Sequence, residues 1–318
     1  MSKIRCAVIG VGYLGRFHAQ KYQLLPEADL VGVCDSNIEN AHRVGQELNV
    51  ATYTNHQELL DKVDAVSIAT TTQTHYEIAK AFLARGIHVL VEKPITETVV
   101  QAQELIQLAH QHQAKFQVGH LERFNSVRLA LDEYLINPQF IEAERLAPFN
   151  PRGADVNVVL DLMIHDIDLI LNMVKSPVTG IQAHGTPVLT KDIDIAHVRL
   201  QFANHCIANL TASRVNQSAS RKTRIIQGDS YLSLDYQNKE LSLFKKGPGE
   251  MFPGIPEIVH ESKVFEQGDA LLAEIKSFLH SIANQSVPLV PGEDGLVALE
   301  TAEHITSLIN KHLLERYA

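Results

Sequence analysis

The first third of the chain alternates between short apolar segments and longer amphipathic ones. The apolar segments are rich in β-branched residues and cover 4–10, 30–34, 65–69, 87–91 and 116–119. The segments between them have helical periodicity or are rich in alanine, and cover 13–25, 38–48, 75–85 and 97–111. Strands that are apolar on both faces and separated by helices indicate a parallel sheet covered on both sides. With right-handed crossovers, residues 1–120 are predicted to form a doubly wound α/β (Rossmann) domain.

After residue 120 the pattern changes to strict alternation of apolar and polar positions. The alternation runs through 196–202, 206–212 and 232–236. A period of two marks strands with one buried face, as in an antiparallel sheet. A Gly/Pro-rich stretch at 246–256 is expected to interrupt this series as a loop. We therefore expect a second α+β domain, 121–318, with a large open antiparallel sheet and closing helices.

Composition narrows the class of protein. A chain of 318 residues fits two domains of about 150 residues each. Its 28 Lys and Arg against 37 Asp and Glu give a net charge of −9, which disfavours nucleic acid and membrane surfaces as partners. Its apolar runs are shorter than the roughly 18 residues of a membrane helix. The three cysteines, Cys6, Cys34 and Cys206, form no C-x-x-C pair, which favours a reducing, cytoplasmic location.

A glycine motif follows the first predicted strand. Gly10, Gly12 and Gly15 fit G-x-G-x-x-G, with a strand before them and a helix after them. The first glycine permits a tight turn, the second lets a pyrophosphate approach the backbone, and the third lets the helix pack on the strand. The N–H groups around Tyr13 and Leu14, together with the helix dipole, would bind the diphosphate. The alternative is a glycine turn without a ligand.

An acid stands at the end of the second predicted strand. Asp35 lies 20 residues after Gly15, the spacing of the carboxylate that accepts hydrogen bonds from the adenosine ribose. It would repel a 2′-phosphate, and the next residues, Ser36 and Asn37, offer no arginine to bind one. The sequence therefore predicts NAD rather than NADP as the cofactor.

A Glu92-Lys93-Pro94 turn follows the predicted strand at 87–91. A lysine at the carboxyl end of a parallel strand faces the crevice where such folds bind ligands, so Lys93 could hydrogen-bond a substrate oxygen. Pro94 is a candidate for a cis peptide bond. The alternative for the motif taken alone is a solvated surface lysine.

A predicted helix carries an aspartate and a histidine one turn apart. Asp161 and His165 share a face that Asp168 continues, while the opposite side is apolar. Burying a carboxylate beside an imidazole is costly unless the pair is used or well satisfied. Histidine titrates near neutral pH, which suits proton abstraction from an alcohol. A satisfied polar pair and a zinc site are the alternatives, and we predict no metal because the sequence offers no second cluster of His or Cys.

Together these motifs resemble the Gfo/Idh/MocA family of NAD(P)-dependent sugar dehydrogenases. The glycine motif, the segment 69–75, the Glu-Lys-Pro turn and the D-x-x-x-H helix occur in the family's order and approximate spacing. The resemblance implies that the catalytic group is Lys93, Asp161 and His165. It also implies further cofactor-binding residues on the nicotinamide and ribose side, namely Thr70, Thr71, His75, Glu92 and Lys93.

Residues 162–168, Leu-Met-Ile-His-Asp-Ile-Asp, look most like one branch of the family. That branch oxidises the 3-hydroxyl of UDP-N-acetylglucosamine and supplies the 3-keto sugar to an aminotransferase for lipid A. Many family members carry glycines around the catalytic aspartate, whereas this chain has Val-Asn-Val-Val-Leu at 156–160 and Met163.

Arginines could contact the diphosphate or uracil of such a substrate. The alternative for each is a solvent-facing charge. We assign substrate binding to Lys93, Asp161, His165 and Arg152, and the other candidates are Arg145, Arg214, Arg221 and Arg224.

The expected activity is oxidation of a secondary CH–OH group with NAD. His165 would accept the hydroxyl proton, Lys93 would hydrogen-bond the same oxygen, and Asp161 would orient the sugar or the imidazole. Two alternatives stay open: a dehydrogenase of a free polyol such as myo-inositol or of another nucleotide sugar, and an NAD-binding redox sensor without turnover. The open sheet predicts a homodimer or homotetramer formed through the second domain.

Overall fold

The computed structural model describes residues 3–151, 156–266 and 268–317. The chain forms two compact units. Unit 1 comprises Met1–Phe124 and Asp269–Leu299, and unit 2 comprises Asn125–Gly268 and Glu300–Ala318. Among the described helices, none combines the length and the apolar character that a membrane span requires.

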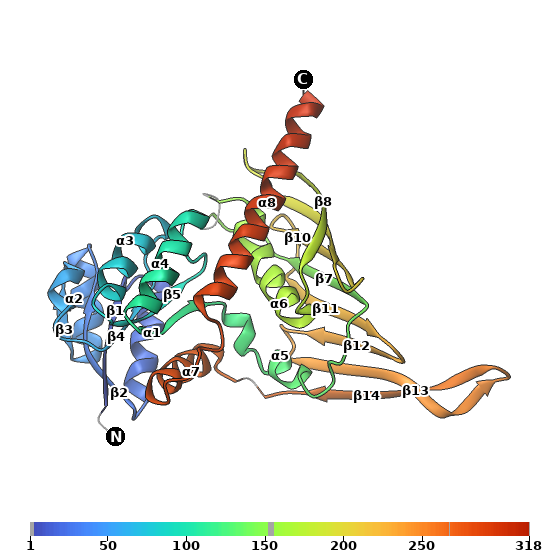
Figure 1. Cartoon of the computed structure of the whole chain (residues 1–318), viewed down its shortest axis with the longest axis horizontal. Helices are drawn as coiled ribbons and strands as arrows, with labels where there is room; N and C mark the ends of the chain where they lie inside the picture. The colour runs from blue at the N-terminus through green and yellow to red at the C-terminus, as the bar shows by residue number, and fades with distance from the viewer. Residues whose placement is uncertain (1–2, 152–155, 267, 318) are drawn as a thin grey trace. The chain divides into compact units, whose positions relative to one another are not determined.

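Unit 1 is built on a sheet of six parallel strands in the order β3-β2-β1-β4-β5-β6 (Figure 1). The strands are β1 (Ile4–Ile9), β2 (Ala28–Cys34), β3 (Ala51–Tyr53), β4 (Ala65–Ile68), β5 (His88–Glu92) and β6 (Phe116–Gly119). The connecting helices are α1 (Tyr13–Leu24), α2 (Ile38–Leu48), η1 (His56–Leu59), α3 (Thr72–Leu83) and α4 (Val99–Gln111). The strand order reverses between β1 and β4, which is the point where such sheets bind ligands at their carboxyl edge. The predicted doubly wound sheet is confirmed.

A distant helix completes the core of unit 1. Helix α7 (Ala270–Ala283) carries an apolar face, including Ile275 and Phe278, that packs with Val8 of β1 and Tyr22 of α1. The 3-10 helix η2 (Leu121–Phe124) also belongs to this unit. The units are therefore not contiguous in sequence, whereas the sequence pattern predicts a single boundary at residue 120. The reason is physical: the apolar face of α7 is buried against α1 rather than within unit 2.

Unit 2 contains an eight-stranded sheet in the order β14-β13-β12-β11-β7-β10-β9-β8. Its strands are β7 (Phe140–Leu146), β8 (Val178–Thr186), β9 (Ile195–Phe202), β10 (Ile207–Ser213), β11 (Ser220–Gln227), β12 (Ser230–Asp235), β13 (Glu240–Phe252) and β14 (Ile255–Val264). Its helical segments are α5 (Ser126–Leu131), the π-helix η4 (Val159–Met163), α6 (Ile164–Val174) and the later part of α8 (Gly292–Tyr317). Neighbouring strands are antiparallel except β7 and β10, so the large, mostly antiparallel sheet is confirmed.

The Gly/Pro-rich stretch does not interrupt this sheet as expected. β13 and β14 continue through it as a hairpin that extends beyond the neighbouring strands (Figure 1). The register between them shifts after Lys246 and again after Glu250. Irregular pairing of this kind accommodates Gly and Pro without ending the ladder, because the extra residues bulge out of the hydrogen-bonded register.

Candidate functional site

A cavity of about 620 Å³ opens at the carboxyl edge of the parallel sheet, where β1, β2 and β4 end. Its lining comes from the glycine loop, the end of β2, η1 and the start of α3. The lining residues are Ile9, Gly10, Gly12, Cys34, Asp35, Ser36, Thr54, His56, Ala69, Thr70, Thr71, Gln73, Thr74, Glu77 and Ile78. The predicted Gly10, Gly12, Asp35, Thr70 and Thr71 are thus brought together around one cavity.

The three motif glycines meet different surroundings. Gly10 has φ +80°, and a Cβ there would lie 2.6 Å from Cγ2 of Thr70. A Cβ at Gly15 would overlap the carbonyl oxygen of Gly10, so only glycine lets α1 pack this closely on the loop. A Cβ at Gly12 would meet no atom within 4 Å. Gly12 therefore leaves open space in the cavity wall, where a ligand can approach the backbone.

Helix α1 begins at this cavity. Gly12 is its N-cap residue and, as a glycine, has no side chain that could cap the first turn. Tyr13 is exposed and packs edge-on against Phe17, with 5.3 Å between ring centroids, and Leu14 is half-buried. A helix N-terminus beside a cavity suits a diphosphate, because its N–H groups and dipole both attract negative charge.

The carboxylate of Asp35 is held in place by backbone donors. Its Oδ2 accepts a hydrogen bond from the N–H of Val11 at 2.9 Å, and its Oδ1 accepts one from the N–H of Asn37 at 2.8 Å. These contacts fix a negative charge on the cavity wall. A ribose hydroxyl can donate to it, whereas a 2′-phosphate would be repelled. The residues present therefore fit NAD.

Sequence reasoning missed part of the cavity wall. Thr54, His56, Gln73 and Glu77 line it from the end of β3, from η1 and from the first turns of α3. Burial lowers the pKa of His56, so its ring is neutral at physiological pH. The position of η1 directly after a parallel strand is the signal that could have pointed to this residue.

His75 lies beneath the cavity rather than among its lining residues. It is 1% exposed, and its ring nitrogens lie 3.0 Å from the carbonyl oxygen of Pro94 and 3.2 Å from that of Thr70. Burial lowers the pKa of His75, so a neutral ring donates to one carbonyl at a time. The side chain thus ties the start of α3 to the turn after β5. Thr74 adds a hydrogen bond to the hydroxyl oxygen of Thr70 at 2.7 Å.

The Glu92-Lys93-Pro94 turn contains a cis Lys93–Pro94 peptide bond, as the sequence suggested. Glu92 turns its carboxylate toward α1, where its Oε1 lies 3.0 Å from Nε2 of His18. It also packs against the end of β6, because a Cβ at Gly119 would lie 2.9 Å from the same oxygen. Lys93 is half-buried. The turn is therefore anchored through Glu92 on one side and through the Pro94 carbonyl on the other.

Asp161 and His165 lie in unit 2, on η4 and at the start of α6, and both are half-buried. The side chain of Asn157 accepts hydrogen bonds from the N–H groups of Val159 at 3.0 Å and Leu160 at 3.1 Å, which starts the helical segment. The predicted α-helix begins here as a π-helical turn, a form that is frequent at functional sites. Lys93 belongs to unit 1, so the candidate catalytic residues are divided between the two units.

A buried ion pair fixes α6 to the sheet. Arg145 of β7 donates to both carboxylate oxygens of Asp166, at 2.9 and 2.8 Å, and both side chains are almost completely buried. Asp166 directly follows His165. The bidentate pair therefore sets the position of the helix turn that carries the candidate base.

A second buried pair holds the segment before η4. Arg214 donates from Nε to Oδ1 of Asp194 at 2.7 Å and also to the carbonyl oxygen of Val156. Burial would raise the pKa of Asp194, but backbone donors at 188–190 and Arg214 outweigh it and hold the pKa well below its usual value. Arg145 and Arg214 are thus committed to internal pairs rather than presented to a substrate diphosphate.

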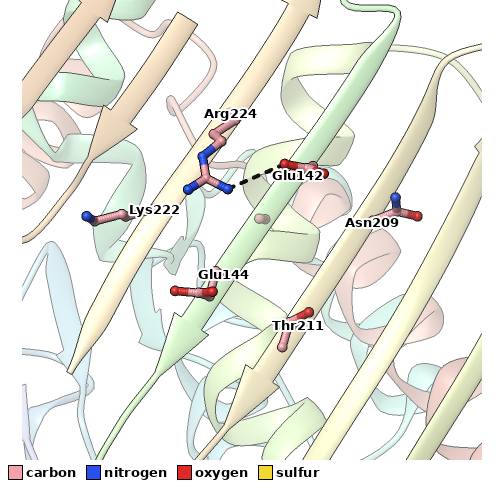
Figure 2. A pocket seen from close by; sticks show the side chains of 7 residues that line it. Glu142, Glu144, Asn209, Thr211, Lys222 and Arg224 are labelled. Atoms are coloured by element: carbon pink, nitrogen blue, oxygen red, sulfur yellow. Dashed lines mark hydrogen bonds and ion pairs between the residues drawn. The ribbon is translucent and has the colours of Figure 1, made fainter. Parts of the chain in front are cut away.

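The remaining candidate arginines differ in the face they occupy. Arg221 is exposed and stands opposite Arg145 in the β11–β7 register, so it projects on the same face of the sheet as α6. Arg224, three positions on, projects on the other face, where its guanidinium lies 3.5 Å from Glu142 (Figure 2). Arg152 lies outside the described residues.

The face of the sheet opposite α6 is polar and hollowed. Its shallow pocket spans β7, β10 and β11, and Figure 2 shows acidic and basic side chains projecting from it side by side. The labelled residues are Glu142, Glu144, Asn209, Thr211, Lys222 and Arg224. Because Asp161 and His165 belong to the helical segment on the other face, this pocket is separate from the candidate base.

Comparisons with known proteins agree with this geometry. A family model described as the oxidoreductase family with an NAD-binding Rossmann fold, Gfo/Idh/MocA, matches residues 4–120. A model of the Gfo/Idh/MocA C-terminal domain matches residues 137–230.

Two named relatives differ in how similar they are. UDP-N-acetylglucosamine 3-dehydrogenase of Acidithiobacillus ferrooxidans is 38% identical over 98% of this chain and 99% of its own. The scyllo-inositol 2-dehydrogenase (NAD(+)) of Bacillus subtilis is 24% identical over 94% of this chain and 92% of its own.

Solved structures give the same order. The structure of the Acidithiobacillus ferrooxidans enzyme superimposes with a TM-score of 0.92 at 38% identity, covering 97% of this chain and 98% of that one. Scyllo-inositol dehydrogenase from Lactobacillus casei, solved with bound NAD(H) and scyllo-inositol, gives a TM-score of 0.80 at 21% identity over 98% of each chain. The second likeness concerns the fold alone.

Proposed function

The chain belongs to the Gfo/Idh/MocA family of NAD-binding oxidoreductases, and from this premise we propose that it oxidises the 3-hydroxyl of UDP-N-acetylglucosamine to the 3-keto sugar. The observation that carries the proposal is the 38% identity, across nearly the whole chain, to an enzyme named for that reaction. Three inositol dehydrogenases that match over 93–94% of the chain are 24% identical to it, and another is 28% identical over 52% of the chain. The segment 162–168, which carries His165, supports the same branch.

NAD is the cofactor of this dehydrogenase, and when bound it supplies the hydride acceptor. The residues that would hold it are the glycine loop, the first turn of α1 and Asp35. Thr70 and Thr71 extend this wall toward the Lys93 turn through the hydrogen bonds of His75. We assign cofactor contacts to these residues, including Tyr13 and Leu14 at the helix N-terminus.

The role of each candidate catalytic residue is assigned from the chemistry of its side chain and from the contacts that hold it in place. We assign to His165 the acceptance of the hydroxyl proton, and to Lys93 a hydrogen bond to the same oxygen that stabilises its developing charge. Asp161 orients the sugar or the imidazole. The ion pair between Arg145 and Asp166 supports these roles, because it holds the turn of α6 next to His165.

Substrate recognition extends the proposal. A UDP-sugar carries a diphosphate, for which a guanidinium is the best-matched side chain. Arg221 is exposed on the α6 face of the sheet, so we assign it to the diphosphate or uracil, together with Arg152.

The 3-keto product is a substrate for transamination, which fits the route to diamino-sugar lipid A. The cysteines Cys6, Cys34 and Cys206 are free thiols, which suits the cytoplasm.

Oligomerisation belongs to the same proposal. The polar face of the unit 2 sheet places Glu142 and Glu144 beside Lys222 and Arg224, so a two-fold axis could pair acid with base. We propose a homodimer or homotetramer formed through unit 2. Sedimentation of the purified protein at micromolar concentration should give a dimer or larger, and a monomer would refute this part.

A substrate panel tests the activity. The enzyme should reduce NAD, followed by nicotinamide absorbance, with UDP-N-acetylglucosamine and far more slowly with myo-inositol, scyllo-inositol or other UDP-sugars. Adding 2-oxoglutarate tests whether bound NADH is reoxidised. Lys93→Met serves as the inactive control. Turnover with an inositol but not with UDP-N-acetylglucosamine would overturn the assignment of substrate.

A further inference from the structure

Three titratable side chains meet in the interior of unit 1, behind the Lys93 turn. They are His18 of α1, Glu92 at the end of β5 and Glu274 of α7, and one nitrogen or oxygen atom of each lies within 4.8 Å of the others. His18 is 1% exposed and Glu274 is 0% exposed. We refer to these three residues as the His18–Glu92–Glu274 cluster.

Glu274 is the unusual member of the cluster. Both of its carboxylate oxygens are buried without a hydrogen-bond partner among the described residues, while the carboxylate of Glu92 lies nearby. An isolated buried carboxylate is strongly disfavoured, and two neighbouring carboxylates cannot both ionise without a cation between them. Glu92 has a donor, Nε2 of His18, whereas none of the residues that the structure describes donates to the carboxylate of Glu274. The negative charge therefore belongs on Glu92.

We propose that the cluster is a proton-holding site in which Glu274 keeps its proton at neutral pH, Glu92 carries the charge, and His18 donates to Glu92. We further propose that the cluster positions the turn bearing Lys93. The second part rests on the function proposed for Lys93. Burial, followed by the charge of Glu92, raises the pKa of Glu274 well above its usual value, which agrees with this assignment.

The neighbouring elements leave this assignment unchanged. From α1, Tyr22 faces the cluster as a neutral phenol, because burial raises its pKa and its hydroxyl bonds Ser67 at 2.9 Å. From β6, the amide of Gln117 donates to the main-chain oxygen of Glu274 at 3.4 Å.

The 3-10 helix η2 packs on α7 and carries two charged residues, Glu122 and Arg123. The guanidinium of Arg123 forms an ion pair with Asp294 at 3.0 Å, so the positive charge of Arg123 is paired with that carboxylate.

The cluster acts on Lys93 through the chain itself. Glu92 directly precedes Lys93. The carboxylate of Glu92 is hydrogen-bonded to His18 and packs closely against Gly119. His75 holds the other side of the turn through the carbonyl of Pro94. Loss of the Glu274 proton would place a second negative charge beside Glu92. Repulsion between the two carboxylates would then displace Glu92, and with it the turn that carries Lys93. Glu92 and Glu274 are thus positioning residues, and Lys93 is the residue they position.

The test compares Glu274→Gln with wild type by thermal unfolding between pH 5 and 8, without substrate or NAD. Glutamine reproduces the protonated acid and cannot ionise. A group whose folded-state pKa is raised loses its stabilising effect as pH rises from the unfolded value of about 4.5 toward the folded one. The Tm of the variant minus that of wild type should therefore increase by about 2 °C per pH unit.

Glu104→Gln is the matched control. Glu104 pairs with Lys80 at 2.7 Å, and hydrogen bonds from Lys80 and Tyr76 lower its pKa, so its titration lies below the tested range. Its Tm difference should stay constant between pH 5 and 8. A constant difference for Glu274→Gln as well would mean that Glu274 is ionised in wild type, and the proposal would be wrong.

Two further measurements complete the test. With a substrate that turns over, the ratio of kcat for Glu274→Gln to kcat for wild type should rise severalfold over the pH range in which the Tm difference levels off, with KM for NAD unaffected. A purely structural glutamate would leave that ratio flat. A metal ion is the alternative to the proton at this cluster, and metal analysis of the purified protein tests for it. One divalent metal per chain, lost in Glu274→Gln, would overturn the proton assignment.

The protonation of Glu274 can be tested independently of the substrate proposed above. If UDP-N-acetylglucosamine fails to react, the unfolding experiment still decides the protonation of Glu274. If Glu274→Gln does not fold, infrared spectra of wild type decide it instead. A protonated carboxyl band that persists at pH 7 and disappears at higher pH supports the proposal, and its absence at pH 7 refutes it.

Discussion

The cofactor cavity of unit 1 and the helix that carries His165 in unit 2 are constructed in different ways. One wall of the cavity is made by a glycine turn and the N–H groups that begin α1, beside a carboxylate held by N–H donors. The helix is held by side chains, through the buried pairs of Arg145 with Asp166 and of Arg214 with Asp194. Backbone geometry requires particular residues at fixed spacings, whereas a buried ion pair can join residues at any distance along the chain.

The largest expected effect concerns Lys93. Lys93→Met removes a donor to the reacting oxygen and should lower kcat by about 10³-fold, within the range for loss of such a group. NAD affinity should change by less than about threefold, because Lys93 is not among the residues that line the cavity of Gly10 and Asp35. Steady-state kinetics and a fluorescence titration with NADH measure the two. Retention of wild-type turnover would mean that Lys93 is an ordinary surface residue.

Removing one partner of the α6 pair should destabilise unit 2. Arg145→Met removes the bidentate partner of the buried carboxylate of Asp166, which costs about 3–5 kcal/mol of unfolding free energy. Glu142→Gln, which breaks an exposed pair on the opposite face, should cost less than about 1 kcal/mol. Urea unfolding measures both. Equal losses would show that the buried pair contributes no more than a surface one.

The two glycines test the backbone side of the comparison. Gly15→Ala introduces a Cβ that collides with the Gly10 carbonyl and should lower the Tm of the protein. Gly12→Ala meets no protein atom, so the Tm should hold while NAD affinity falls by roughly 10-fold from contact with the ligand. Thermal unfolding with and without NAD separates the two outcomes. A fall in Tm for Gly12→Ala would contradict the open space at that position.

The smallest expected effect concerns the arginines of β11. Arg221→Met should raise KM for UDP-N-acetylglucosamine by about 10-fold with a modest change in kcat, because a guanidinium–phosphate contact forms in both ground and transition states. Arg224→Met, on the opposite face of the same strand, is the matched control and should leave KM unchanged. Equal KM values for the two variants would remove Arg221 from the substrate site.

Much of unit 1 could be predicted from the sequence because its signals are local. Both the strand and helix pattern and the family resemblance carried by the glycine motif, the Glu-Lys-Pro turn and the D-x-x-x-H helix are confirmed. His56 and Glu77 of the cavity were missed, because they carry no fixed spacing to the glycines. The catalytic roles of Lys93, Asp161 and His165 stay predictions.

Long-range contacts were beyond the sequence. Arg145 and Arg214 were candidates for a substrate, and only the folded chain shows that each pairs with a buried aspartate outside its own strand, 21 and 20 residues away respectively. The same holds for Glu274, whose neighbours His18 and Glu92 lie in α1 and β5, in the first third of the chain. Likewise the β13–β14 hairpin runs through a stretch whose Gly and Pro content favours a loop, because pairing between the two strands outweighs local propensity.

Helix α7 has a consequence for how the protein is made. Its apolar face completes the core around Tyr22 of α1, yet it is translated only after the strands of unit 2. During synthesis on the ribosome, the hydrophobic surface of unit 1 that α7 covers therefore stays exposed until residue 283 has emerged. A nascent chain arrested before that point should be recognised by chaperones, whereas one arrested after it can close its first core.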